Sequence, residues 1–187
     1  MADAVKSATL LHEVLWPHKE AMAAKWKDMV NGTYPFETIG FLRTQHNRFA
    51  NPVGYRTEQA AAIIMDALFT ERPDEEALLA AVDDIIRVRA VQDFSPEAAV
   101  GVILAMKQVI RDQVRVSDQA QACLPALLAL ESRIDAVALM AFGVYARCRE
   151  TLHQMKVDEF KRQHSQVLRL LERRAGKLDK ADSTTDS

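Results

Sequence analysis

Residue types that build common functional sites are scarce in this chain of 187 residues. It has two cysteines, six glycines and six prolines, and aromatic residues make up 6% of it. Cys123 and Cys148 lie far apart, so neither a disulfide framework nor a paired-cysteine metal knuckle is predicted. Glycine-rich phosphate loops, nucleophile elbows and histidine–glutamate zinc motifs are not found either. We therefore expect a protein that is not an enzyme and carries no metal or other cofactor.

Strong charge of one sign and long hydrophobic runs are also missing. The net charge of −2 at pH 7 is too small to predict a nucleic-acid or membrane-binding surface. The longest uncharged apolar runs, such as residues 136–146, fall well short of the roughly 20 residues that span a bilayer. The first residues lack the basic region of a secretory signal, and His12 and Glu13 interrupt the apolar run. These features predict a cytoplasmic protein with no nucleic-acid partner and no membrane insertion.

The sequence has instead a high content of apolar residues, 49%, at helical spacing. Long segments with a period of 3.6 residues predict an all-α fold, globin-like or a related orthogonal bundle, with a long C-terminal helix. Pro17 predicts a break in the first helix. Helix starts are predicted at Thr57, near Asp74, and at Ser95, where Pro96 and Glu97 complete the signal.

Three parts of the chain follow from this pattern. A helical sensory domain is predicted over residues 1–156 and a helical extension over residues 157–175. Gly176 is expected to end the last helix, leaving a polar, disordered tail over residues 176–187.

Apolar residues recur along the last predicted helix at heptad spacing, which is typical of a coiled-coil seam. The spacing predicts either a dimer seam or part of the internal core. The predicted seam residues are Leu127, Leu130, Ile134, Val137, Ala141, Val144 and Cys148.

A charged pair interrupts the apolar face that leads to Ser95. At 100° per residue, Arg89 and Asp93 fall on the same arc as Ile85 and Ile86, with the i,i+4 spacing of a helical ion pair. We interpret the pair as a buried lock at the helix end or, alternatively, as a polar switch or ligand contact. Lys107 and Arg111, one turn apart on the next helix, are expected to approach Asp93 and complete an internal polar cluster.

Other candidate sites have weaker support. A DNA-binding helix-turn-helix at Ser95 is disfavoured because the second helix offers mainly apolar side chains to base edges. The five histidines are scattered, and His18 is interpreted as a core or boundary residue. The connector before Thr57 could grip an anionic ligand or nucleic acid, although its aromatics more simply anchor it to the helices. Its residues of interest are Phe41, Arg43, Arg48, Phe49, Tyr55 and Arg56.

Three ordered segments resemble one known family. "RFANPVGYR", "DDIIRVRAVQDFSPEAAV" and "RIDAVALMAFGVYARCRETLHQMKVDEFKR" are similar to the N-terminal domain of RsbRD, an RsbT co-antagonist, and the resemblance covers about residues 41–162. It implies a non-enzymatic sensory domain with a haem-free globin-like fold that works as a dimer. It also implies protein partners in stress signalling, either STAS proteins or an RsbT-like kinase.

The sequence departs from the full family pattern at its C-terminal end. In full-length co-antagonists a linker helix leads to a C-terminal STAS domain that the kinase phosphorylates, and we expect no such domain in the twelve residues after Ala175. The leading hypothesis is a regulatory protein of signal transduction. The alternatives are a globin-like sensor that binds a small ligand or haem, and a structural dimerising adaptor. A haem-free site is favoured because residues 95–116 contain no histidine.

Overall fold

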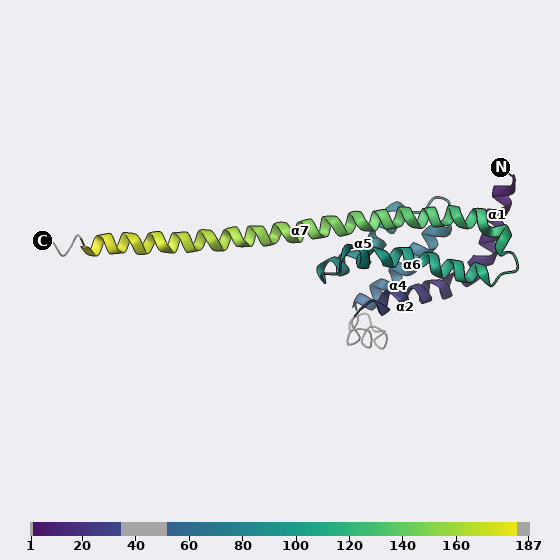
Figure 1. Cartoon of the computed structure of the whole chain (residues 1–187), viewed down its shortest axis with the longest axis horizontal. Coiled ribbons are helices and arrows are strands. Elements are labelled where there is room, and N and C mark those ends of the chain that lie inside the picture. Colours follow the sequence, from purple (N-terminus) through teal and green to yellow (C-terminus); the bar gives the residue numbers. More distant parts are fainter. Residues whose placement is uncertain (1, 35–51, 183–187) are drawn as a thin grey trace. The chain divides into compact units, whose positions relative to one another are not determined.

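The computed structural model describes the backbone of residues 2–34 and 52–182, and the side chains of residues 5–34 and 54–165. The described backbone is helical with no strand, so the predicted all-α class is confirmed. The described elements are α1 (Ala2–Leu15), the 3₁₀ helix η1 (Trp16–His18), α2 (Lys19–Gly32), α4 (Pro52–Phe69), α5 (Glu75–Val91), α6 (Pro96–Arg115) and α7 (Ala120–Asp182) (Figure 1).

Three local signals in the sequence act as predicted. Pro17 lies in η1, where the first helix changes to a 3₁₀ turn before α2. Asp74 caps α5 by accepting a hydrogen bond from the backbone N–H of Ala77 at 3.0 Å. Ser95 caps α6 in the same way through Ala98. Each side-chain oxygen satisfies a backbone donor that has no partner within its helix.

Two predicted helix boundaries are wrong. α4 begins at Pro52, not at Thr57, because proline is well tolerated in the first turn of a helix; Thr57 is a buried residue inside it. α7 continues through Gly176 to Asp182, because one glycine costs only about 1 kcal/mol within a run of strong helix formers. The connector predictions for Phe41, Arg43, Arg48 and Phe49 lie outside the described residues.

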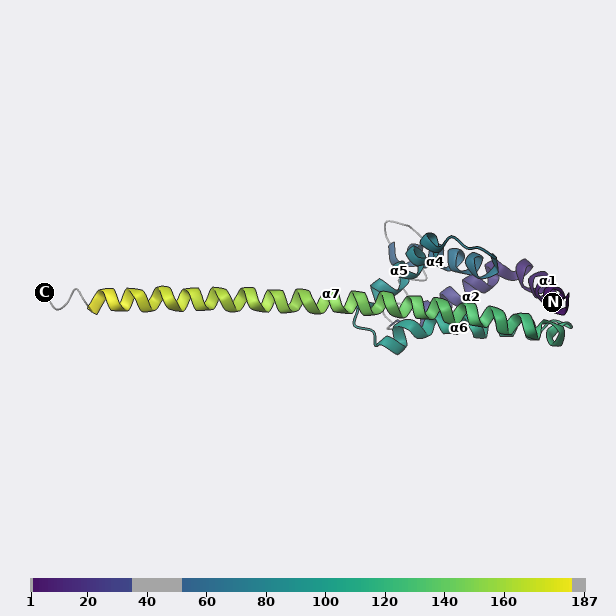
Figure 2. The same cartoon turned by 90° about the horizontal axis from the view of Figure 1, so that it is seen from above.

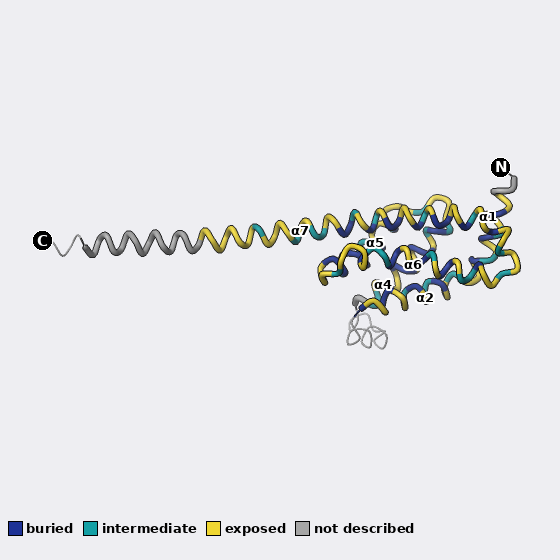
Figure 3. Tube along the Cα trace, viewed as in Figure 1, coloured by how far each residue is buried: buried dark blue, intermediate teal, exposed yellow. Residues whose placement is uncertain are grey.

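The chain divides into two units, Met1–Cys148 and Arg149–Ser187. In the first unit α2 packs against α4 and α6, α4 packs against α5, and α1 reaches α6. One continuous core fills the unit, with Leu15, Trp26, Ile64, Ile86 and Ile103 among its fully buried side chains. Figure 3 shows the buried positions on all of these helices.

The first part of α7 is a wall of this core. It runs beside α6 in both views of the structure (Figures 1 and 2), and ion pairs join the two helices. Residues 127–144 of the predicted seam are all at least 92% buried within the single chain, and Cys148 is half-buried. The seam is therefore internal core, which is the second of the two roles that its spacing predicted. Heptad spacing fits either role, because a helix uses the same stripe to pack on neighbours of its own chain.

The second unit contributes the rest of α7. Its described side chains, residues 149–165, are mostly exposed, including the large apolar residues Met155 and Phe160. No helix within the described residues is long and apolar enough to cross a membrane.

Candidate functional site

Arg89, in the last turn of α5, is completely buried. Its Nη2 atom donates hydrogen bonds to Thr33 Oγ1 at 2.9 Å and to the carbonyl oxygen of Ala98 at 3.0 Å. The guanidinium carbon lies 4.2 Å from the centre of the Phe94 ring and 5.3 Å from that of the Tyr34 ring. One side chain thus joins the end of α2, the α5–α6 corner and the first turn of α6.

The same guanidinium is only partly satisfied. Among the described residues, its Nε and Nη1 atoms are buried without a hydrogen-bond partner, and no carboxylate forms an ion pair with it. Burial lowers the pKa of Arg89 and raises that of Tyr34, while the attraction between the two acts against both shifts. Two aromatic faces partly replace water around the cation. A buried charge with donors to spare is costly, and such groups concentrate at sites that switch or bind.

The α5–α6 corner is also tied to α7. Phe94 donates its backbone N–H to the carbonyl of Arg89 at 3.1 Å, and its own carbonyl accepts a 2.7 Å hydrogen bond from the hydroxyl of Tyr145. Tyr145 is 7% exposed and comes from the middle of α7. A shift of the corner would therefore strain or break a contact with the longest helix.

Asp93 does not lie where the sequence analysis placed it. α5 ends at Val91, and Asp93 follows in the turn as an exposed residue with a left-handed φ of 58°. Because the helix stops first, the i,i+4 geometry of a helical pair is lost, and Arg89 bonds to Thr33 and Ala98 instead. The prediction of a buried Arg89–Asp93 pair is wrong, whereas the burial of Arg89 is confirmed.

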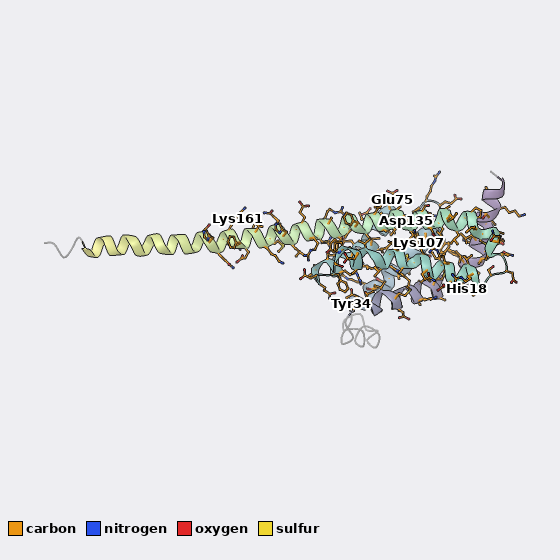
Figure 4. The ribbon with its side chains drawn as sticks, in the orientation of Figure 1. His18, Tyr34, Glu75, Lys107, Asp135 and Lys161 are labelled. Atoms are coloured by element: carbon orange, nitrogen blue, oxygen red, sulfur yellow. The ribbon has the colours of Figure 1, made fainter. Side chains whose placement is uncertain are left out.

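Lys107 and Arg111 do not join this corner. Lys107 pairs with Asp135 at 2.6 Å, and Figure 4 shows these two side chains together between α6 and α7. Arg111 makes two hydrogen bonds to Glu131, at 2.6 and 2.7 Å. The predicted cluster fails for a geometric reason: Lys107 is eleven helical steps after Pro96, which is roughly 16 Å at 1.5 Å per residue.

The residues that complete the corner were missed from the sequence. Thr33 and Tyr34 follow the end of α2 and lie about 55 residues before Arg89 in the sequence. No local sequence pattern predicts a contact between residues so far apart. Tyr145 had a weak signal, because it is adjacent to the core stripe of α7 and a buried tyrosine hydroxyl needs a partner. His18 is exposed, not in the core, since η1 interrupts the stripe on which it was placed (Figure 4).

No group of three His, Cys, Asp or Glu side chains in the described parts of the chain is arranged to hold a metal ion. Cys123 is buried in the core, where burial raises the pKa of its thiol. This thiol is therefore a packing group and not a reactive one.

Comparison with known proteins places the chain in a family. No curated protein and no solved structure matches the chain, so a globin-like arrangement of the helices stays a prediction. The model of the "RsbT co-antagonist protein rsbRD N-terminal domain" matches residues 20–159. This range includes the whole Arg89 corner and Tyr145. Because the match covers more than half of the sequence, the chain belongs to the RsbRD N-terminal domain family.

Proposed function

We propose that this chain is a non-enzymatic sensory protein of signal transduction that works in the cytoplasm through contacts with other proteins. Its family suggests a sensory domain of the RsbR type. The family implies regulatory contacts with other proteins, and we propose a STAS protein or an RsbT-like kinase as the partner. The stress response is the proposed physiological setting.

The buried Arg89 at the α5–α6 corner is the observation that carries the proposal. A switch needs an element with two arrangements that differ by a few kcal/mol. A cation with two unpartnered donor atoms leaves the observed arrangement less than fully satisfied. Because Tyr145 joins the corner to α7, a change at the corner would act on α7. We propose that α7 relays it.

α7 also offers surfaces for partners. In the first unit Leu128, Leu139 and Phe142 are more than half exposed, and at 100° per residue they lie within one narrow face of the helix. We propose this outer face of α7 as the contact of a homodimer. It replaces the predicted seam, which the core occupies. In the second unit the exposed Met155 and Phe160 are proposed contacts for a signalling partner.

A direct binding experiment tests the sensory proposal. Calorimetry with the purified full chain would measure its affinity for a STAS-domain protein and for an RsbT-type kinase. Binding to either supports the proposal, and Tyr145→Phe, which removes only the hydroxyl, should change that affinity several-fold. Arg87→Gln is the matched surface control, since Arg87 pairs with Asp83 on the exposed side of α5. Failure of both proteins to bind, or equal affinities for all variants, contradicts the proposal.

Sedimentation at micromolar concentration tests the dimer separately. We expect a dimer that Phe142→Glu converts to a monomer, because the substitution places a charge within an apolar contact. Val116→Glu is the control, since Val116 is 78% exposed and lies outside α7. A monomeric wild type, or a Phe142→Glu protein that stays dimeric, would exclude this face.

A further inference from the structure

A second feature of the first unit is a cavity of about 680 Å³ between α1, the C-terminal end of α4 and the first turns of α7. This volume is within the range of sites for small organic molecules, roughly 300–1,000 Å³. The cavity is separate from the Arg89 corner and shares no lining residue with it.

The wall of the cavity is mostly apolar. Leu11, Leu68 and Leu130 form its deep part, and all three belong to the core of the unit. Phe69 adds an aromatic face. Ala8 and Ala129 are exposed and leave the outer side open. Burying an apolar molecule against such a wall is favourable, because apolar surface is removed from water. The small residues on the outer side leave an entrance.

One cation lines the cavity without a carboxylate partner. Arg133 of α7 is half-buried, and its Nη2 atom donates hydrogen bonds to the carbonyl oxygens of Ala67, at 2.8 Å, and of Thr70. These bonds fix the guanidinium at the end of α4 and use two of its five N–H donors. No carboxylate of the described residues forms an ion pair with it. The positive charge is held in place and is available to an anion.

Ser7 and Pro125 hold the two long walls together. Ser7 Oγ of α1 donates to the carbonyl of Ala122 at 2.8 Å and accepts from the backbone N–H of Ala126 at 3.3 Å. These two groups are one turn apart on either side of Pro125, which lies inside α7 and lacks a backbone N–H. The hydroxyl therefore links α1 directly to α7. This link fixes the two helices that form the long walls of the cavity.

We infer that this cavity binds a small amphiphilic monocarboxylate, with the carboxylate on Arg133 and the apolar body against the leucine and phenylalanine wall. Glu71 also lines the cavity, but it is exposed at the rim and solvated, whereas Arg133 is half-buried and fixed. The inner charge therefore decides the sign of the ligand. The inference does not rest on the proposed function. If both are correct, the monocarboxylate is the signal that the domain senses.

Decanoate is a suitable probe, with decanol and decyltrimethylammonium as neutral and cationic controls of equal chain length. Trp16 offers a fluorescence readout, because its ring stacks on His12 and meets Phe69 edge-on, and both of these residues line the cavity. We expect saturable binding of decanoate to the full chain, confirmed by calorimetry, and at least tenfold weaker binding of both controls. Equal affinity for the three probes, or no binding of decanoate, would overturn the inference.

Substitutions locate the site. Ala129→Trp should abolish decanoate binding by filling the entrance, whereas Ala80→Trp, at an exposed position of α5 outside the cavity, should not. Arg133→Met should weaken binding tenfold or more, and Glu71→Gln should strengthen it about twofold because a negative charge leaves the rim. If Arg133→Met does not fold, the comparison of Ala129→Trp with Ala80→Trp and the comparison of the three probes still test the inference. Decanoate binding that survives Ala129→Trp refutes this site, whatever is found for kinases or STAS proteins.

Discussion

Arg89 and Arg133 are two arginines of the same unit, and neither forms an ion pair with a described carboxylate. Both donate to backbone carbonyls near helix ends, Arg89 to Ala98 and Arg133 to Ala67 and Thr70. They differ in their surroundings. Arg89 is closed in by Tyr34 and Phe94 and has no exposed surface, whereas Arg133 lines a cavity that is open to solvent.

The difference separates two uses of a cation. A fully buried charge cannot contact a ligand unless the structure changes. Arg89 can therefore bias the arrangement of the corner but cannot readily bind a ligand from solution. A fixed charge in an open apolar cavity can bind an anion with no rearrangement. We therefore propose Arg89 as the internal switch and Arg133 as the ligand contact.

The largest expected effect is at Arg89. Arg89→Ala should lower the free energy of unfolding by about 3 kcal/mol, because it leaves a large cavity in the core and removes the bonds to Thr33 and Ala98. Arg89→Met keeps most of the volume without the buried charge and should cost less than about 1 kcal/mol. Urea denaturation of both variants provides the measurement. Equal losses would mean that the charge itself stabilises the corner, and the switch assignment would fail.

A smaller effect is expected at Arg133. Arg133→Met should cost about 1.5 kcal/mol, because two charge-assisted hydrogen bonds, to the carbonyls of Ala67 and Thr70, are lost in a half-solvated setting. Arg133→Lys should recover part of that loss, since lysine keeps the charge but not the planar fork. Thermal unfolding of both variants checks this order. A Met variant as damaging as Arg89→Ala would remove the contrast between the two arginines.

The backbone of the corner gives the next prediction. Asp93 has a left-handed φ of 58°, which glycine adopts without strain and alanine does not. Asp93→Ala and Asp93→Gly both delete the carboxylate, so any contact of that group cancels between them. The glycine variant should be more stable by about 1 kcal/mol. Chemical denaturation of the pair measures the difference, and equal stabilities would show that the turn relaxes without strain.

The helices and their starts could be predicted because their causes are local. Pro17, Asp74 and Ser95 each act within one turn of their own position, and the apolar period needs no knowledge of distant residues. The period could not say whether the stripe from Leu127 to Cys148 faces a second copy or the chain's own core. Only the packing of α6 against α7 decides that, and it places the stripe inside.

The site was less predictable than the fold. The burial of Arg89 followed from its place on the apolar arc, but its partners did not. The prediction of Asp93 as the partner assumed that α5 continues two residues further than it does. Thr33, Tyr34 and Tyr145 meet Arg89 or its corner through tertiary packing. The cavity at Arg133 had no signal in the sequence, since it is formed by α1, α4 and α7 together.

Arg111 supplies the reference for an arginine that has a carboxylate, and it gives the smallest expected effect. Its Nε and Nη2 atoms donate hydrogen bonds to the two oxygens of Glu131, whose side chain is 10% exposed, and the pairing lowers the pKa of that carboxyl below its ordinary value of 4.5.

The lowered pKa of Glu131 makes the stability depend on pH: the stabilisation is present above about pH 4.5 and is lost as the pH falls through the pKa of the folded state. Because Arg111 is half-exposed, solvent screening keeps this stabilisation small. Glu131→Gln should therefore reduce stability near neutral pH and flatten its decline in acid, whereas Glu13→Gln, at an exposed position of α1, should leave the profile unchanged. Unfolding measured from about pH 3 to pH 7 tests this. An unchanged acid profile in Glu131→Gln would mean that the pair adds nothing, and a paired arginine would then be no better a stabiliser of this fold than the unpaired Arg89.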